Sequence, residues 1–378
     1  MSPRTTDPLA VGIAGLGMAG CALLPFIRAH PDFELVAAAE PVRAVRDRFA
    51  GHGLELFGDI EPMLRAGIVD VVYVASATPL HHDNAIAALS SGHHVIVEKP
   101  MAVSLGQARA MVSAAESADR ILLVGHSHSY EAPIRAMRRI VRDGALGPIR
   151  SISALYYSDW MRRGRRPEEL DPAQGGSVPL RQGAHQIDVV RYIGGGLLRS
   201  VRGRVSRESA GGPGEGAYAA YLEFADGTPA TLAYNGYGHF SSTELTFGID
   251  EAGRQPAGPE RASRRAGLLQ HGEHQPFFGL VLLSCEEGDV RVSPDGLHVY
   301  RDGDVEAVSL RGEMRGRAAM LSELAAAVGG ERAAMHDGAW GLANLEASLA
   351  LRQSSATRTE VRLYEQVQLA DSLTTEPA

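Results

Sequence analysis

The chain has little cysteine, no long hydrophobic run and no excess of positive charge. Its 378 residues include only Cys21 and Cys285, too few for a disulfide framework or a cysteine-based zinc site. We find no signal peptide and no apolar run that could span a bilayer, so we expect a cytoplasmic protein without a membrane partner. The net charge of −8 predicts that nucleic acid is not a partner, because no basic face dominates the chain.

One arginine-rich segment is present at residues 162–166, where four arginines are interrupted only by Gly164. It is too short for a nucleic-acid surface, which leaves two interpretations: a solvated loop, or a segment near an anionic ligand. The length of the chain predicts two domains of ordinary size, and a hydrophobic content of 44% can fill their cores.

Three glycines follow the first apolar run. The motif Gly15-x-Gly17-x-x-Gly20 comes after an expected strand at residues 10–14 and opens an expected helix at residues 19–29. In this setting the first glycine permits a tight turn, the second lets the backbone approach a pyrophosphate, and the third lets helix and strand pack closely. The helix N-terminus attracts the phosphates. A purely structural glycine turn is the alternative, and the context favours a dinucleotide site.

An acidic residue follows the second expected strand. That strand covers residues 33–39 and ends at Glu40, twenty positions after Gly20. A carboxylate there can accept hydrogen bonds from an adenosine ribose and would repel a 2′-phosphate, which favours NAD over NADP. Arg43 keeps NADP open, because a nearby guanidinium could pair with that phosphate.

Strands and helices alternate up to about residue 125, which predicts a doubly wound parallel sheet. Beyond a helix at residues 132–142, strand-like runs follow one another and predict a mainly antiparallel open sheet covered by helices on one face. We therefore expect an α/β protein with a Rossmann domain at residues 1–127 and an α+β domain at residues 128–378. Ligands of a doubly wound sheet bind at the carboxyl ends of its strands.

Glu98-Lys99-Pro100 follows an expected buried strand at residues 94–97, where a nicotinamide should lie. A desolvated lysine has a lowered pKa and can act as a general acid or base near neutral pH. The alternative is a lysine that pairs with Glu98 for structure alone.

A second cluster lies on one stripe of a later expected helix, where Arg181, His185 and Asp188 are spaced by four and three residues. Asp188 could orient His185 and stabilise its charged form, as carboxylates do in acid–base pairs. A buried histidine of the core is the alternative. Histidines 81, 82, 126 and 128 stand on separate loops, so we expect no metal.

Taken in order, these motifs resemble the Gfo/Idh/MocA family of oxidoreductases. The matching segments are Gly15 to Gly20, Thr78-Pro79 with His82 and Ala85, Gly92-His93-His94-Val95, Glu98-Lys99-Pro100, Gly144-Ala145-Leu146-Gly147 and Gly183-x-His185-x-x-Asp188. The resemblance implies bound NAD(H) or NADP(H), hydride transfer at a carbinol or carbonyl carbon, and Lys99 and His185 as acid–base residues. It also implies a C-terminal domain that binds the substrate and joins a homodimer or homotetramer. The expected cofactor contacts are Gly15, Gly17, Met18, Ala19, Gly20, Glu40, Ser76, Thr78, Pro79, His82, Glu98, Lys99 and Pro100.

The chain departs from the family at Arg181, where many relatives carry an aspartate four residues before the histidine. A guanidinium there is suited to bind a carboxylate, so we expect an anionic substrate anchored by Arg181. Alternatively, Arg181 pairs with Asp188 or Glu98 and only balances charge.

Segments at residues 159–160, 166–171, 175–176, 181–186 and 237–240 resemble the subgroup named 4,5-dihydroxyphthalate dehydrogenases. We therefore expect hydride transfer between NAD(P) and a secondary alcohol or ketone of a small, cyclic, carboxylate-bearing metabolite such as a dihydrodiol. The expected substrate contacts are His128, Tyr157, Asp159, Trp160, Arg181 and Asp188.

Two other functions stay open. One is a lyase, epimerase or glycoside-cleaving enzyme that retains NAD without net redox. The other is a non-catalytic NAD(P)-binding regulatory protein, which the presence of both Lys99 and His185 disfavours.

Overall fold

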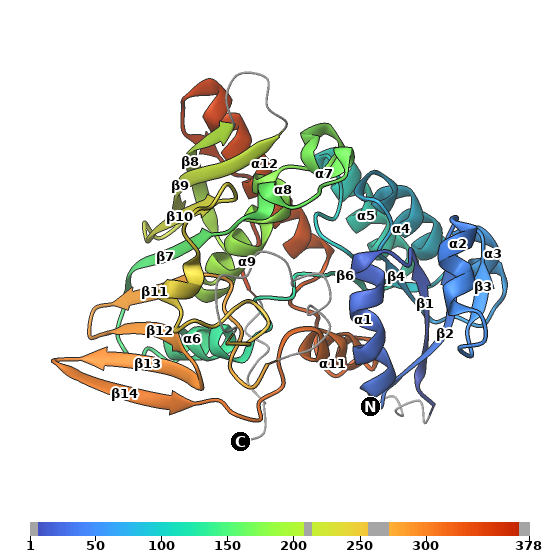
Figure 1. Cartoon of the computed structure of the whole chain (residues 1–378), viewed down its shortest axis with the longest axis horizontal. Coiled ribbons are helices and arrows are strands. Elements are labelled where there is room, and N and C mark those ends of the chain that lie inside the picture. Colours follow the sequence, from blue (N-terminus) through green and yellow to red (C-terminus); the bar gives the residue numbers. More distant parts are fainter. Residues whose placement is uncertain (1–6, 208–213, 256–271, 370–378) are drawn as a thin grey trace. The chain divides into compact units, whose positions relative to one another are not determined.

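The computed structural model describes residues 7–207, 214–255 and 272–369 (Figure 1). The chain divides into two units, each with its own β-sheet. The first unit comprises the described residues up to His126 together with Arg317–Leu345. The second comprises Ser127–Gly316 and Glu346–Leu369. Within the described ranges, no helix is long and apolar enough to cross a membrane.

The first unit contains a six-stranded parallel sheet in the order β3-β2-β1-β4-β5-β6. Its strands are β1 (Leu9–Ala14), β2 (Phe33–Ala39), β3 (Glu55–Phe57), β4 (Val71–Val74), β5 (His94–Val97) and β6 (Leu122–Val124). Every residue of β4 and β6 is buried, as expected for parallel strands covered on both faces. The strand order reverses between β1 and β4, beside which ligands of such sheets bind. The predicted doubly wound sheet is confirmed.

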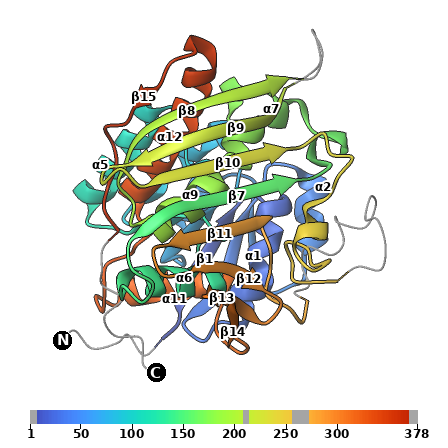
Figure 2. The same ribbon diagram turned by 90° about the vertical axis from the view of Figure 1, so that its left-hand side faces the viewer.

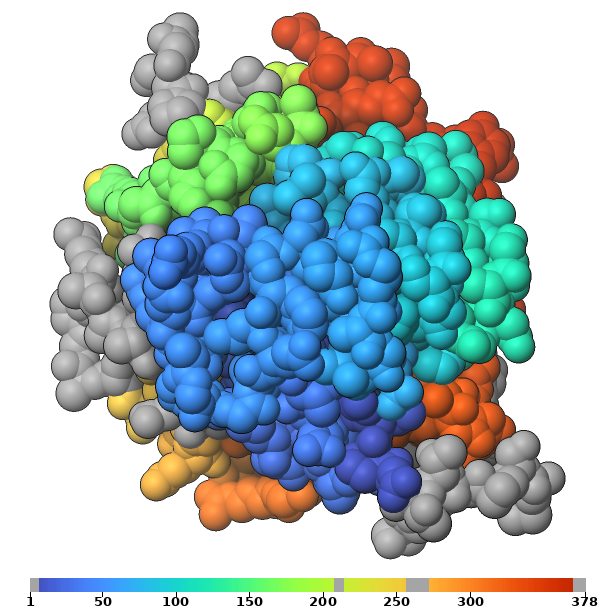
Figure 3. Space-filling model, turned by 90° about the vertical axis from the view of Figure 1, so that its right-hand side faces the viewer, coloured from blue at the N-terminus to red at the C-terminus, as the bar shows by residue number. Residues whose placement is uncertain are grey.

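Helices connect these strands and cover the sheet. They are α1 (Met18–Ala29), α2 (Arg43–Arg46), α3 (Ile60–Arg65), α4 (His81–Ser90) and α5 (Leu105–Ala118). Local capping sets where two of them begin: the Asp59 side chain accepts a hydrogen bond at the start of α3, and Ser104 does the same for α5. The space-filling view of Figure 3 shows a face made largely of segments coloured blue to cyan.

The chain returns to the first unit near its end. Helix α11 (Gly316–Val328) and the part of α12 (Gly338–Thr357) up to Leu345 belong there, apart from Gly316. The Val124 amide of β6 donates to the His336 carbonyl at 2.9 Å, and Trp340 is only 1% exposed. The end of the chain therefore completes the core beside β6. The sequence division after residue 127 contained no such return.

The second unit contains a nine-stranded sheet in the order β14-β13-β12-β11-β7-β10-β9-β8-β15 (Figure 2). Its only parallel pair among the described strands is β7 with β10, so the prediction of a mainly antiparallel sheet is confirmed. The strands are β7 (Ile149–Tyr157), β8 (Leu198–Arg207), β9 (Glu215–Phe224), β10 (Pro229–Asn235), β11 (Leu280–Cys285), β12 (Asp289–Ser293), β13 (Gly296–Arg301), β14 (Asp304–Ser309) and β15 (Val361–Arg362).

Alternating burial along the central strands gives this sheet one covered face. Helices α6 (Ala132–Arg142), α8 (Val178–Arg181) and α9 (Gly183–Gly194) cover it, and α9 is buried along nearly its whole length. Helix α9 approaches β9 closely, because a Cβ on Gly194 would lie 2.3 Å from the Phe224 ring. The predicted helix that carries His185 is therefore an interior helix.

Candidate functional site

The structure explains in different ways why glycine occupies each of three positions in the turn after β1. Gly15 has a φ of +104°, and a Cβ there would lie 2.8 Å from the Ala75 carbonyl oxygen. A Cβ on Gly20 would lie 2.0 Å from the Gly15 carbonyl oxygen. A Cβ on Gly17 would meet nothing within 4 Å. Packing therefore explains Gly15 and Gly20, whereas Gly17 stands at an open position.

Gly17 is also the N-cap of α1, and no side chain caps this helix. The amide groups of its first turn are therefore available to an external acceptor. Of the next two residues, Met18 is 59% exposed and Ala19 is half-buried. Open space before uncapped amides suits a phosphate group, so this turn fits a dinucleotide.

Glu40 lies beside this turn at the end of β2. One carboxylate oxygen accepts the Leu16 amide at 2.9 Å and the other accepts the Val42 amide at 3.0 Å. Glu40 is 7% exposed, so its charge is held in place next to the glycines. The Arg43 guanidinium lies 3.7 Å from Asp47, and its side chain is 86% exposed. The acid thus lies beside the glycine turn, whereas Arg43 is directed to the surface.

The carboxylate of Glu98, after β5, is bound from two sides. The Tyr73 hydroxyl donates to its Oε1 at 2.6 Å, and the Lys99 amide donates to its Oε2 at 3.2 Å. Burial raises the pKa of Tyr73 well above its usual value, and the charge of Glu98 adds to this effect. Tyr73 therefore remains a proton donor to Glu98. The same hydroxyl lies 3.4 Å from the Ala19 carbonyl, which connects the Glu98-Lys99-Pro100 segment with the glycine turn.

Lys99 is half-buried and is the only lysine among the 378 residues. Pro100, which follows it, is buried.

A buried histidine joins the segments that follow β4 and β5. The Nδ1 atom of His81 lies 2.9 Å from the Pro100 carbonyl oxygen, and its Nε2 lies 3.0 Å from the Ser76 carbonyl oxygen. Asn84 donates to the Ser76 hydroxyl at 3.0 Å. By contrast, His82 lies nearer the surface with its Nδ1 2.7 Å from an Asp83 carboxylate oxygen. His82 stays a predicted cofactor contact, and His81 is the residue that the structure places between these segments.

A short 3-10 turn at Thr78–Leu80 connects β4 with α4. Thr78 is buried, and Pro79 stands in the first positions of the turn. Sequence reasoning missed Tyr73 and Asn84, and it placed His81 only among the histidines near the ligand-binding edge of the sheet. Tyr73 had a usable signal, because a hydroxyl in an otherwise apolar buried strand needs a hydrogen-bond partner.

In the second unit, His185 lies in the first turn of α9 and is 6% exposed. Its ring meets His128 edge-on at 4.5 Å and Phe278 at 5.1 Å. The His128 ring stacks on Phe278 at 4.3 Å. His128 and His185 were predicted from sequence, whereas Phe278 was missed, and no local motif marks it. The rings of His128 and Phe278 thus pack against the imidazole of His185.

Asp188 is completely buried and accepts a hydrogen bond from the Ser129 hydroxyl. Its neighbour Gln186 accepts a hydrogen bond from the Tyr218 hydroxyl. These groups belong to the interior polar network of α9. The prediction that Asp188 contacts a substrate therefore has no exposed surface to support it.

The segment after β7 carries a basic cluster, which we define as Asp159, Arg163, Arg165, Glu169 and Arg181. The Arg163 guanidinium donates to one Asp159 oxygen through Nε and Nη2, at 2.8 and 2.7 Å. Burial by itself would raise the pKa of Glu169. A backbone hydrogen bond and the charges of Arg181 and Arg165 outweigh this effect and hold that pKa below its usual value. Arg181 thus lies close enough for its charge to act on Glu169, an acid that neither sequence interpretation had considered.

Two other predicted residues flank the cluster. Trp160 is 4% exposed, and the Arg165 guanidinium carbon lies 3.9 Å from the centre of its ring. Burial lowers the pKa of Arg165, an effect that Glu169 opposes. Tyr157 is half-buried and meets Phe240 edge-on at 5.7 Å.

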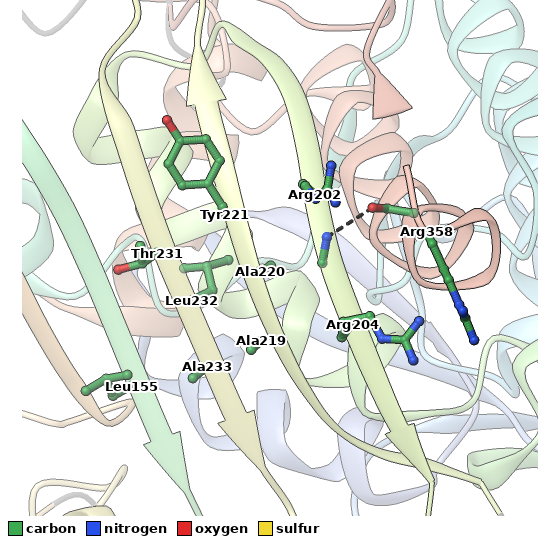
Figure 4. A pocket seen from close by; sticks show the side chains of 12 residues that line it. Leu155, Arg202, Arg204, Ala219, Ala220, Tyr221, Thr231, Leu232, Ala233 and Arg358 are labelled. Carbon is green, nitrogen blue, oxygen red and sulfur yellow. Dashed lines mark hydrogen bonds between the residues drawn. The ribbon is translucent and has the colours of Figure 1, made fainter. Parts of the chain in front are cut away.

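A broad depression of about 870 Å³ lies elsewhere, on the open face of the nine-stranded sheet (Figure 4). Strands β8, β9 and β10 supply most of its lining, including Arg202, Arg204, Ala219, Tyr221 and Ala233. None of the predicted site residues lines it. Among the residues that the structure describes, no group of three or more histidine, cysteine, aspartate or glutamate side chains could hold a metal ion.

Comparison with known proteins gives a consistent picture. A model described as "Oxidoreductase family, NAD-binding Rossmann fold" matches residues 9–126, and the Gfo/Idh/MocA C-terminal domain model matches residues 134–249. The 1-carboxy-3-chloro-3,4-dihydroxycyclohexa-1,5-diene dehydrogenase of Comamonas testosteroni is 31% identical over 91% of this chain and 94% of that protein.

Solved structures agree with this comparison. A crystal structure from Bordetella bronchiseptica RB50, of a protein described as a dehydrogenase, has a TM-score of 0.87 and 36% identity. The match covers 94% of this chain and 100% of that one. The WlbA dehydrogenase of Bordetella pertussis, solved with NADH and UDP-GlcNAcA, has a TM-score of 0.73 and 19% identity over 95% of this chain and 99% of its own. At that identity the likeness concerns the fold alone.

Proposed function

Because this chain belongs to the Gfo/Idh/MocA family of oxidoreductases, we propose that it is an NAD-dependent dehydrogenase of a carboxylated cyclic alcohol. A cyclic dihydrodiol is the alcohol that we favour, since the Comamonas relative is named for one with a carboxyl group. The observation that carries the proposal is the basic cluster. Arg181, next to Glu169, offers a guanidinium that suits a substrate carboxylate.

The first unit supplies the residues that would hold NAD. In this proposal the α1 N-terminus at Gly17 receives the pyrophosphate, and Glu40 accepts hydrogen bonds from the adenosine ribose. The open position at Gly17 and the buried acid support this assignment. The remaining contacts are proposed for Gly15, Met18, Ala19, Gly20, Ser76, Thr78, Pro79, His82, Glu98, Lys99 and Pro100. When bound, NAD supplies the hydride acceptor.

The proton of the substrate hydroxyl leaves to Lys99 or His185 while the carbon gives up its hydride. With a cyclohexadiene diol, the ketone so formed tautomerises to a phenol, which makes the oxidation favourable. The composition supports Lys99 in this role. Of the 37 lysine and arginine residues in the chain, all except Lys99 are arginine. A guanidinium does not release its proton near neutral pH. An amine here indicates a requirement for proton transfer.

The test is a screen of cyclic diols and ketones, with and without a carboxylate, using NAD(H) and NADP(H) and following absorbance at 340 nm. We expect oxidation of a carboxylated dihydrodiol with NAD. Lys99→Met and Lys99→Arg should both lose turnover while they still bind NAD, because the arginine keeps the charge without the transferable proton. Normal turnover in Lys99→Arg would contradict the assignment.

The same screen separates the other two functions. Turnover without an absorbance change, together with nicotinamide retained in the purified protein, would support a lyase, epimerase or glycoside-cleaving reaction. Binding of NAD without any turnover would support a regulatory protein.

We also propose that the protein is a cytoplasmic homodimer or homotetramer that associates through the open face of the nine-stranded sheet. The exposed Tyr221 and the small residues around it support this face as the contact. Sedimentation analysis should show dissociation of Tyr221→Glu but not of Met314→Glu, a control at a residue that is 49% exposed. An unchanged mass for Tyr221→Glu would contradict the proposed contact.

A further inference from the structure

Arg165 is held rigidly while its outer edge stays available. Its guanidinium lies on the Trp160 ring, and its Nε donates to the Trp160 carbonyl at 2.9 Å. This is its single hydrogen bond among the residues that the structure describes. Nη1 lies 3.6 Å from the nearest Glu169 oxygen, beyond hydrogen-bond length. The edge formed by Nη1 and Nη2 therefore retains its donors, although the side chain is only 12% exposed.

The neighbouring arginines use their donors differently. Arg163 gives Nε and Nη2 to Asp159. The Nη2 atom of Arg162, which is exposed, lies 2.6 Å from the His239 ring. Arg166 is 63% exposed, so solvent hydrates it. Arg165 alone in residues 162–166 combines burial, a fixed orientation and an available donor edge.

The basic cluster holds three arginines, Arg163, Arg165 and Arg181, and two acids, Asp159 and Glu169. Other charged groups adjoin it: Arg166 lies 3.2 Å from Glu168 and 3.7 Å from Glu169, and the charge of Glu251 acts on Tyr234 together with those of Arg163 and Arg165. The donor edge that Arg165 retains has room for one carboxylate rather than two.

A series of contacts connects the donor edge of Arg165 with His185. Tyr234 lies close enough to Arg165 for each to affect the other electrostatically. The Tyr234 ring meets Tyr156 at 5.2 Å, and Tyr156 meets Phe278 at 4.7 Å. Phe278 in turn contacts His185 at 5.1 Å. A continuous row of packed, buried rings within the second unit thus extends from His185 to the surroundings of Arg165.

We propose that Arg165, seated on Trp160, is a specificity-determining residue that binds the single carboxylate of the substrate together with Arg181. The two terminal nitrogens of Arg165 match the two oxygens of a carboxylate, and the tryptophan holds the guanidinium in the orientation for this bidentate contact. The inference rests on the proposed function, because it names the residue that selects a monocarboxylated ring over a neutral or dicarboxylated one.

The test measures the binding of benzoate, benzamide and phthalate to the NAD-loaded protein by calorimetry. We expect the wild type to prefer benzoate over benzamide, and phthalate to bind no tighter than benzoate. Arg165→Gln should weaken benzoate binding by about 10- to 100-fold and leave benzamide unchanged, since a hydrogen bond to a charged group is lost. Arg165→Lys should fall between them, because it keeps the charge but lacks the paired donors. Arg162→Gln is the matched control and should change neither, because Arg162 is exposed and its guanidinium contacts His239 rather than the cluster.

The proposal is wrong if Arg165→Gln weakens both ligands equally, if it leaves benzoate unchanged, or if the wild type does not bind benzoate. It is also wrong if phthalate binds ten times more tightly than benzoate. If Arg165→Gln melts below the wild type, Arg165→Lys decides by the same comparison. The proposed function is tested separately by diol turnover: a benzoate preference that depends on Arg165, without oxidation of any diol, would reject the reaction and keep the binding site.

Discussion

We expect Ser177→Gly to stabilise the protein. Ser177 precedes α8 with φ 89° and ψ 156°, a backbone region that glycine adopts readily and other residues almost never do. Holding a serine there costs about 1–3 kcal/mol. Its hydroxyl is completely buried and has no hydrogen-bond partner among the described residues, which costs about 1–3 kcal/mol more.

Glycine removes both costs but loses about 0.5–1 kcal/mol through the greater freedom of the unfolded chain. We therefore expect a net gain of about 1–5 kcal/mol in the free energy of unfolding. Ser177→Ala is the matched variant, because it removes the hydroxyl and keeps the backbone strain. Its gain should be smaller, and the difference between the two variants measures the strain.

Urea unfolding at fixed NAD concentration, followed by circular dichroism, gives both values. The reasoning fails if Ser177→Gly unfolds more easily than the wild type while Ser177→Ala is neutral, because the backbone would then carry no strain. A functional cost should accompany the gain. The Arg181 amide donates to the Ser177 carbonyl at 3.0 Å, so a more mobile residue 177 should raise the KM of an acidic substrate.

Three further predictions concern the first unit. Tyr73→Phe removes the donor to Glu98 and should cost about 1.5–3 kcal/mol in unfolding experiments, with a lower kcat in steady-state assays. Glu40→Gln should lower the kcat/KM ratio of NAD to NADP by about tenfold, since the buried negative charge that repels a 2′-phosphate is lost; an unchanged ratio would contradict this role. Burial lowers the pKa of His94 to about 4, and its Nδ1 accepts the Ile121 amide. Below pH 6.5 the unfolded chain therefore binds a proton at His94 that the folded protein takes up only near pH 4. The free energy of unfolding should therefore decrease as the pH is lowered from about 6.5 to 4. In urea titrations, His94→Asn should show a flatter pH dependence.

Much of the fold was predictable because its signals are local. Buried parallel strands read as short apolar runs, and the Gly15 to Gly20 segment marks where β1 passes into α1. The parallel pairing of β7 with β10 and the return of residues 317–345 to the first unit depend on contacts between distant segments. Helical periodicity predicts α11 and α12 but does not indicate the sheet against which they pack.

The candidate site divides in the same way. Lys99, His185 and Glu40 stand in recognisable motifs, whereas the role of Arg165 depends on its position over Trp160, which no spacing rule predicts. The choice between His81 and His82 required the orientation of the first turn of α4, because adjacent residues on a helix point in directions about 100° apart.

The exchange of aspartate for arginine at position 181 changes the charge of the basic cluster by two units. With an aspartate there, the cluster would hold two arginines and three acids, and its net charge of −1 would repel a carboxylate. With Arg181 the net charge is +1, and the negative charge of Glu169, on which both Arg165 and Arg181 act, offsets part of the repulsion between the two guanidinium groups. The same acid leaves the donor edge of Arg165 unused, because its nearest oxygen stays 3.6 Å away. Glu169 therefore stabilises two half-buried guanidinium groups, and the donor edge of Arg165 can still bind an anion. A relative that carries the aspartate and the same loop should, by this argument, prefer a neutral ring.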